Sequence, residues 1–313
     1  MLILNSITSD LTSLPIRKEI YLFAKFFASI GALAAWIASA HAAMTVTVQG
    51  PESPTDKRYE YDRAVIELAL AKTRTKYGDF KIQDTPVGQN SKRALIDASN
   101  NKYTNFIIKF SMNNDLPDSL TAIPFPVDLG VVGYRVALVS NKTKSALSKV
   151  RTLEELKKFE VLQGLGWLDT RILEHHGFKV RTGAEYEAMF SMVALGRSDL
   201  FLRGANELLN EWQSHLEIDG LAYDEAICIY YPLPRFLVTS SENKELIARV
   251  HEGLLLAHED GSLFELWDQK YRASVDFAKL DNRRIFRLSN PFIEGLDPSW
   301  QKFVYQAGPK LTQ

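Results

Sequence analysis

GLGWLDTRIL, residues 164–173, follows a short apolar strand pattern at 161–163 and opens a helix pattern that stops at Gly177. Two glycines at a strand-to-helix turn let the backbone come close to a ligand. The free N–H groups and the positive dipole end of the helix favour an anionic or polar group. The stretch therefore predicts a small-molecule site at the carboxyl end of a parallel strand. A tight turn with Trp167 in the core is the alternative, and Asp169 argues against a phosphate.

Strand and helix patterns alternate on both sides of this stretch. Thr152 with Glu155, and Thr182 with Glu185, are predicted capping boxes at helix starts. Repeated β-α units indicate an α/β fold, with mostly parallel sheets flanked by helices on both faces. In open parallel sheets, ligands gather at the carboxyl ends of the strands. The candidate segments that follow strands are 49–52, 88–91, 111–113, 164–169, Thr182 and Arg203.

Composition narrows the class of protein. The 313 residues are 46% apolar and 24% charged, which is typical of a soluble globular chain of about two domains. The 37 basic and 38 acidic side chains nearly cancel, so we expect no nucleic-acid partner. Cys228, the only cysteine, allows no intrachain disulfide, and its apolar surroundings predict a buried thiol.

The first residues have the pattern of an export signal. Three basic side chains precede an apolar run at 26–40, and Ala40-His41-Ala42 supplies an A-x-A end. We therefore predict that residues 1–42 are a signal peptide cleaved before Ala43, and that the protein is periplasmic. An uncleaved membrane anchor is the alternative, although the run is shorter than the ~20 residues that a span requires.

Several stretches resemble the solute-binding proteins of ABC transporters, specifically the family 3 type that binds polar amino acids. They are 61–71, IPFPVDLGVVGYRV at 123–136, GLGWLDTRIL, the DLFLRG region within 186–204, 230–234 and 258–267. The resemblance implies a two-lobe type II periplasmic-binding fold with the ligand in the cleft. Lobe 1 would comprise 44–131 plus 233–313 and lobe 2 would comprise 132–232. Two crossings are expected, near 130–135 and 231–236.

One departure from the family concerns the ligand. Amino-acid binders of this family place a threonine and then an arginine after the third strand, whereas this chain reads Ser111-Met112-Asn113 with no arginine following. Arg203 is a candidate for the missing positive charge, and a structural pair with Asp199 or Glu207 is its alternative. The predicted ligand-binding residues are Gln49, Ser111, Asn113, Gly166, Trp167, Asp169 and Arg203.

Two of these residues have alternative roles. Trp167 either stacks on a ligand or fills the lobe, and Asp169 either caps its helix or accepts from a ligand amine. The predicted function is non-catalytic capture of a small polar, amino-acid-like solute for an ABC permease, by a monomer without cofactor or metal. A ligand-sensing domain for a membrane receptor is one alternative. An exported dehydratase-like enzyme using Glu52 and Asp169 is another.

Overall fold

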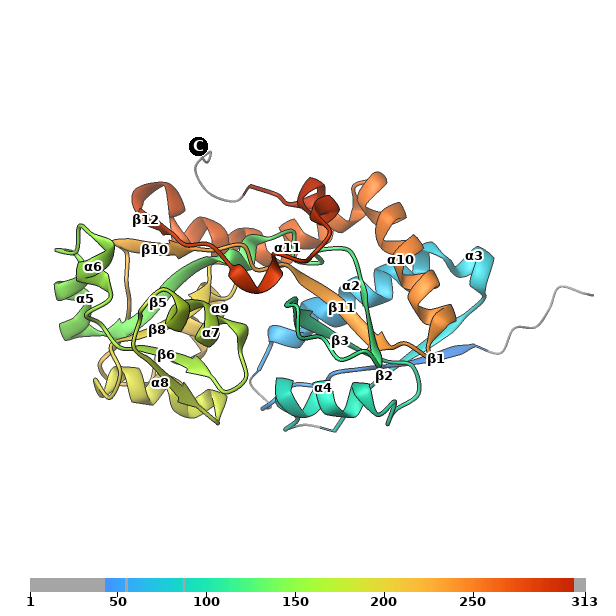
Figure 1. Cartoon of the computed structure of the whole chain (residues 1–313), viewed down its shortest axis with the longest axis horizontal. Coiled ribbons are helices and arrows are strands. Elements are labelled where there is room, and N and C mark those ends of the chain that lie inside the picture. The colour runs from blue at the N-terminus through green and yellow to red at the C-terminus, as the bar shows by residue number, and fades with distance from the viewer. Residues whose placement is uncertain (1–42, 54–55, 87, 307–313) are drawn as a thin grey trace, which may run out of the picture. The chain divides into compact units, whose positions relative to one another are not determined.

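A computed structural model describes residues 43–53, 56–86 and 88–306; the predicted signal peptide lies outside these residues. The described residues from Met44 onward belong to one compact unit that contains two sheets (Figure 1). The first sheet has the order β2-β1-β3-β11-β4. Its strands are β1 (Met44–Val48), β2 (Phe80–Asp84), β3 (Phe106–Ser111), β4 (Leu120–Ile123) and β11 (Arg235–Ser240).

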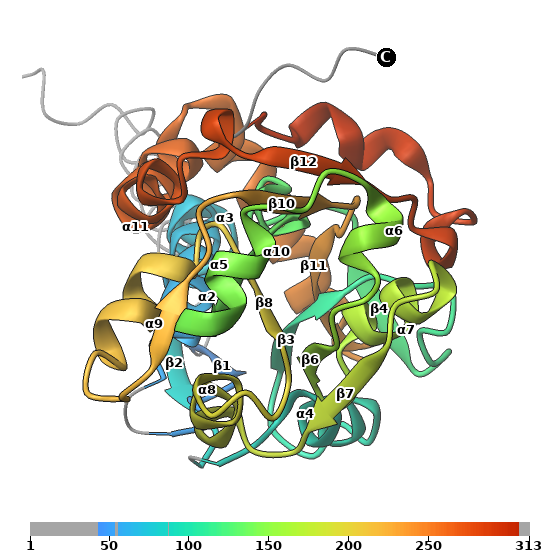
Figure 2. The ribbon, with the colours of Figure 1, turned by 90° about the vertical axis from the view of Figure 1, so that its left-hand side faces the viewer.

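The second sheet has the order β12-β10-β5-β8-β6-β7, with β9 paired to β5. Its strands β12, β10, β8, β6 and β7 are labelled in Figure 2. Its strands are β5 (Tyr134–Ser140), β6 (Val161–Gly164), β7 (Val180–Gly183), β8 (Leu200–Gly204), β9 (Leu221–Tyr223), β10 (Ile227–Tyr230) and β12 (Arg284–Arg287). Strands β2-β1-β3 and β7-β6-β8 are parallel, while β5 and β11, which follow the two crossings, pair antiparallel with their neighbours. We call each sheet with its covering helices a lobe.

Helices cover both faces of each sheet. In lobe 1 they are α2 (Arg58–Lys72), α3 (Arg74–Tyr77), α4 (Ser91–Ser99) and α10 (Lys244–Glu259). In lobe 2 they are α5 (Asn141–Leu147), α6 (Leu153–Leu156), α7 (Leu168–His175), α8 (Tyr186–Ala194) and α9 (Leu208–Ser214). Helix α11 (Ser262–Ala278) packs against α2, α9 and α10. Short 3-10 turns complete the fold at Val131–Gly133, Leu280–Asn282, Pro291–Ile293 and Pro298–Phe303.

Alternation along the strands explains why both faces are covered. On β3, Ile107 packs into the core under α2 and α10, while Phe106 and Ile108 pack on the opposite face under α4. On β5, Val136 and Leu138 face one way and Ala137 and Val139 the other, all buried. Because successive side chains point to opposite faces, a continuous apolar strand needs cover on both sides. The α/β, two-lobe fold class is therefore confirmed.

The chain crosses between the sheets at the two predicted places, from β4 to β5 and from β10 to β11, but it crosses a third time between β11 and β12, which was not predicted. The assignment of 233–313 to lobe 1 does not hold for β12, which pairs in parallel with β10 of lobe 2. Pairing with β12 covers an edge of β10 that would otherwise be exposed. The tail then returns to lobe 1, where the N–H of Tyr305 donates to the carbonyl of Leu129 at 2.9 Å.

One of the two predicted capping boxes forms. Thr152 and Glu155 make both reciprocal bonds at the start of α6. Thr182 instead lies in β7, and α8 begins with Glu185 at its N-cap without a side-chain cap. Within the described residues, every helix is too short or too polar to cross a membrane.

Candidate cleft between the lobes

The seven residues predicted to bind ligand line one cleft of about 130 Å³. Lobe 1 contributes Gln49, Ser111 and Asn113, each directly after β1 or β3 or at its end. Lobe 2 contributes Gly166, Trp167 and Asp169 from the turn after β6, and Arg203 from β8. The carboxyl ends of these strands meet at the cleft, which is why residues distant in the sequence gather here. That these residues bind a ligand stays a prediction.

The turn after β6 needs its glycines for two different reasons. Gly166 has φ +82°, a conformation that residues with a Cβ rarely adopt. At Gly164, an added Cβ would lie 2.3 Å from Cε2 of Trp167, so the indole ring covers this backbone closely. Trp167 also stacks on Phe201 at a centroid distance of 6.3 Å while lining the cleft. The ring therefore packs on its lobe and forms part of the cleft wall.

Asp169 does not cap its helix. Trp167 is the N-cap of α7 and makes no side-chain cap bond. The buried carboxylate of Asp169 instead accepts the Tyr231 hydroxyl at 2.6 Å and lies 2.5 Å from Nη2 of Arg135. The capping prediction is wrong because this side chain finds a cation and a hydroxyl on the two crossing segments. A carboxylate gains more from a charged guanidinium and a hydroxyl than from a neutral backbone N–H group.

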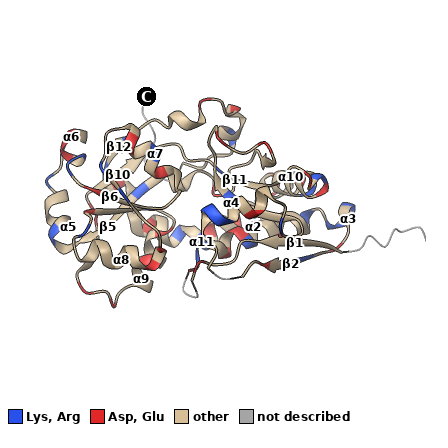
Figure 3. Cartoon of the chain, turned by 60° about the horizontal axis from the view of Figure 1, so that its bottom comes forward, with Lys and Arg blue, Asp and Glu red and all other residues tan. Residues whose placement is uncertain are grey.

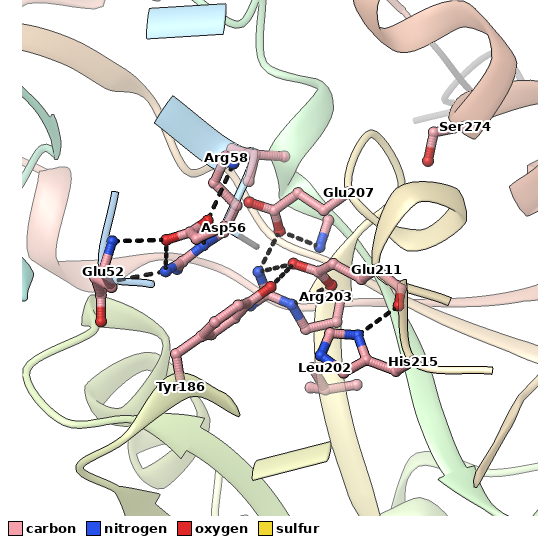
Figure 4. Close-up of polar contacts among 12 residues, drawn as sticks. Glu52, Asp56, Arg58, Tyr186, Leu202, Arg203, Glu207, Glu211, His215 and Ser274 are labelled. Carbon is pink, nitrogen blue, oxygen red and sulfur yellow. Dashed lines mark hydrogen bonds and ion pairs between the residues drawn. The ribbon is translucent and has the colours of Figure 1, made fainter. Parts of the chain in front are cut away.

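Arg203 lies in a buried ion cluster (Figure 4). Its guanidinium donates to both carboxylate oxygens of Glu211, at 2.7 and 2.6 Å, and lies 3.0 Å from Glu207. Only 1% of the residue is exposed, so it does not lie free at a solvent-filled cleft as the sequence suggested. The alternative prediction is a structural pair of Arg203 with Asp199 or Glu207. Among the described residues, Glu207 forms this ion pair and Asp199 does not. Two carboxylates already neutralise the charge that we expected to hold a ligand anion.

The cluster fixes the ionisation of Glu207. Burial alone raises the pKa of a carboxyl group, but the guanidinium of Arg203, followed by those of Arg235 and Arg135, outweighs it. The pKa of Glu207 is consequently well below its usual value. Glu207 is therefore an anion in the cleft wall at neutral pH.

The lobes contact one another beside the cleft. Arg58, at the start of α2, lies 3.7 Å above the ring of Tyr186 on α8, and Asp56 holds its guanidinium through two hydrogen bonds. The hydroxyl of Ser53 donates to Glu187 of lobe 2 at 2.7 Å. Basic and acidic segments lie next to one another near α2 (Figure 3). The structure is thus in a conformation in which charged side chains of lobe 1 meet lobe 2.

The three predicted ligand-binding residues of lobe 1 differ in how many hydrogen bonds their side chains make within the protein. Gln49 donates to the Tyr59 hydroxyl and to the carbonyl of Gln89, each at 3.0 Å. Asn113 accepts the N–H of Asp115 at 2.9 Å. Among the described residues, the hydroxyl of Ser111 has no hydrogen-bond partner within the protein. Ser111 is therefore available to a ligand without breaking an internal bond.

Sequence reasoning missed several cations of the cleft. Arg58, Lys109, Arg171 and Arg235 also line it. Arg235 is the first residue of β11 and lies directly opposite Ser111 in the antiparallel pairing with β3. The predicted crossing at 231–236 includes Arg235, but the sequence does not show that Arg235 lies beside Ser111. That contact depends on the register between β11 and β3.

Comparisons with known proteins identify the fold. No model of a protein family matches the sequence, and no curated protein matches it. An ancestral arginine-binding protein bound to arginine is 15% identical, with a TM-score of 0.55 over 74% of this chain and 100% of that chain. The GluR0 ligand binding core in complex with L-glutamate is 12% identical, with a TM-score of 0.53 over 74% and 100%.

A third solved structure is the ancestral amino acid-binding protein AncCDT-1, described as a precursor of cyclohexadienyl dehydratase. It is 17% identical, with a TM-score of 0.54 over 73% of this chain and 96% of that chain. At these identities the similarity concerns the fold. The chain has the two-lobe type II fold of periplasmic solute-binding proteins.

Proposed function

We propose that this protein captures a small polar, amino-acid-like solute in the cleft between its lobes and delivers it to an ABC permease. The observation that carries the proposal is the convergence of Gln49, Ser111 and Asn113 from one lobe with the 166–169 turn and Arg203 from the other. A solute that contacts both walls stabilises the closed arrangement over the open one. Moving a mostly open ensemble to a mostly closed one takes about 5.5 kcal/mol of differential binding.

The named ligands of the similar structures support an amino-acid-like solute. Arginine and L-glutamate occupy two of those proteins, and AncCDT-1 is described as amino acid-binding. The cleft itself offers hydroxyl, amide, carboxylate and guanidinium groups beside one aromatic wall. This mixture suits a solute with several polar groups and a short apolar part.

Thermal unfolding with each of the twenty L-amino acids tests the proposal, followed by calorimetry of any solute that raises the melting temperature. Trp167→Ala should weaken binding about tenfold, which corresponds to about 1.4 kcal/mol. Trp212→Ala is the matched control, because Trp212 is also partly buried in lobe 2 but lies outside the cleft. Equal affinities for the two variants would contradict the cleft as the binding site.

We also propose export to the periplasm through residues 1–42. Mass spectrometry of the exported protein should place Ala43 at or within a few residues of its N-terminus. A mature chain that still contains residues 26–40 would contradict the signal-peptide prediction.

A ligand-sensing domain would use the same cleft with a different partner. Deletion of the gene should abolish uptake of the bound solute if the protein serves a permease. Unchanged uptake together with a lost response to the solute would favour sensing.

The dehydratase-like alternative is motivated by the similarity to AncCDT-1. Its two candidate carboxylates both have partners in the structure: Glu52 pairs with Arg58, and Asp169 pairs with Arg135. Prolonged incubation with a bound solute, followed by NMR, should return the solute unchanged. Net formation of a dehydrated product would establish the enzyme.

A further inference from the structure

Arg235, the first residue of β11, lies directly opposite Ser111, the last residue of β3. Its Cα pairs with that of Ser111 across strands β11 and β3, so it enters the cleft beside the end of β3. We propose that Arg235, supplied from the neighbouring antiparallel strand, binds the carboxylate group of the solute. This inference rests on the proposed function and names the residue that selects the ligand.

The guanidinium of Arg235 retains unused donors. It makes no hydrogen bond to any described residue, and its buried Nε atom has only a distant ion-pair contact with Asp128. The nearest carboxylate oxygens are 3.5 Å away, on Glu207, and 4.0 Å away, on Asp128. Both distances exceed the roughly 2.7–3.2 Å between donor and acceptor in an ordinary N–H···O hydrogen bond. A ligand carboxylate would give these donors the partner that the protein does not supply.

The other cations of the cleft are already paired at short range. Arg203 is held by two glutamates, Lys109 pairs with Asp62, and Arg171 lies 2.5 Å from Asp115. A new anion would have to compete with those carboxylates. At Arg235 it meets the weakest competition, since the contacts there are the longest of the set.

The backbone around Arg235 is fixed on both sides. Its carbonyl accepts the N–H of Val127 at 3.0 Å, and the carbonyl of Pro234 accepts the N–H of Met112 at 2.9 Å. Strand β11 lies between β3 and β4 within the sheet. A side chain that starts from a rigid strand loses less freedom on binding than one on a loop.

Glu207 lies where it could bind a positively charged group of the solute next to the solute's carboxylate. Its Oε2 atom accepts the N–H of Gly204 at 2.9 Å and faces Arg203, while its Oε1 atom faces Arg235. An anion of lobe 2 and a guanidinium of lobe 1 that makes no hydrogen bond thus lie 3.5 Å apart in the lining of the cleft. A solute that carries an ammonium next to its carboxylate matches this pair.

The test compares each L-amino acid that binds with its α-carboxamide, which removes only the carboxylate charge. The wild-type protein should bind the amide at least about tenfold more weakly, and Arg235→Gln should lose this preference along with about 10- to 100-fold of affinity for the acid. Arg235→Lys keeps the charge but not the planar fork and should lose about tenfold. Arg63→Gln is the control, because Arg63 is an exposed, ion-paired arginine of lobe 1 that lies outside the cleft; this variant should bind within about threefold of wild type.

The possible failures are distinct. If the wild type binds acid and amide alike, or if Arg235→Gln binds the acid as tightly as the wild type does, Arg235 does not hold the carboxylate, although the cleft still binds solute. If Arg235→Gln fails to fold, the Arg235→Lys result decides. If no amino acid binds the wild type, the proposed function itself fails and this inference with it.

Discussion

Arg203→Ala should destabilise the fold strongly, contrary to what its position after a strand suggests. The substitution removes the cation from between Glu207 and Glu211, whose side chains are only 9% and 6% exposed. Breaking a buried ion pair by removing one partner costs about 3–5 kcal/mol, because a buried charge is left uncompensated. For a chain of this length, that loss lowers the melting temperature by roughly 2–4 °C per kcal/mol, or about 10 °C in total.

Urea unfolding at several pH values tests this reasoning. In the wild type, the lowered pKa of Glu207 contributes stability that is complete above the unfolded value of about 4.3 and is lost as the pH falls through the folded value. Without Arg203, burial should raise the pKa of Glu207. Protonation of Glu207 would then remove the uncompensated buried charge and so restore part of the variant's stability. The difference in free energy of unfolding between the wild type and Arg203→Ala should therefore decrease as the pH falls from 7 to about 5.

Arg171→Ala, at an exposed ion pair, should change the free energy of unfolding by at most about 1 kcal/mol. A deficit of the Arg203 variant no larger than that of this control would refute the buried-cluster reasoning. A deficit that does not depend on pH would refute the assigned role of Glu207.

Three further predictions follow from close packing and burial. Gly164→Ala should cost about 1–3 kcal/mol in urea unfolding and shift the tryptophan emission, since its Cβ would overlap Trp167; an unchanged spectrum would contradict this contact. Tyr231→Phe should cost about 1–3 kcal/mol because it removes the hydroxyl bonded to Asp169, whereas equal stability would mean that water replaces it. Burial raises the pKa of the Cys228 thiol to about 12, so a disulfide reagent at pH 8 should label it only in denaturant, and rapid labelling of the native protein would show that it is accessible.

The fold and the location of the cleft could be predicted from sequence because both depend on local patterns. Apolar runs such as 106–108 and 134–139 marked strands that are buried on both faces, and GLGWLDTRIL marked the turn at a strand end. Once strands alternate with helices, their carboxyl ends must meet. Residues after those ends, such as Ser111 and Trp167, therefore gather without further information.

The charge pairing within the cleft could not be predicted in the same way. Arg203 and Glu211 are eight residues apart, and whether α9 turns its acidic side toward β8 depends on tertiary packing. Arg235 became a neighbour of Ser111 only through the antiparallel register of β11, which a single sequence does not specify. The composition shows that 37 basic and 38 acidic side chains nearly cancel, but it does not say which cation lacks a hydrogen-bond partner in the fold.

Asp169 connects the cleft to the two crossing segments near 130–135 and 231–236. Its partners are Arg135, just after the first crossing, and Tyr231, within the second. The crossings also touch each other, since the N–H of Tyr231 donates to the carbonyl of Gly133 at 3.2 Å. Separating Asp169 from Arg135 would leave a buried charge unpaired, at a cost of several kcal/mol. The buried contacts of Asp169 therefore tie the 164–169 turn to the segments at 130–135 and 231–236.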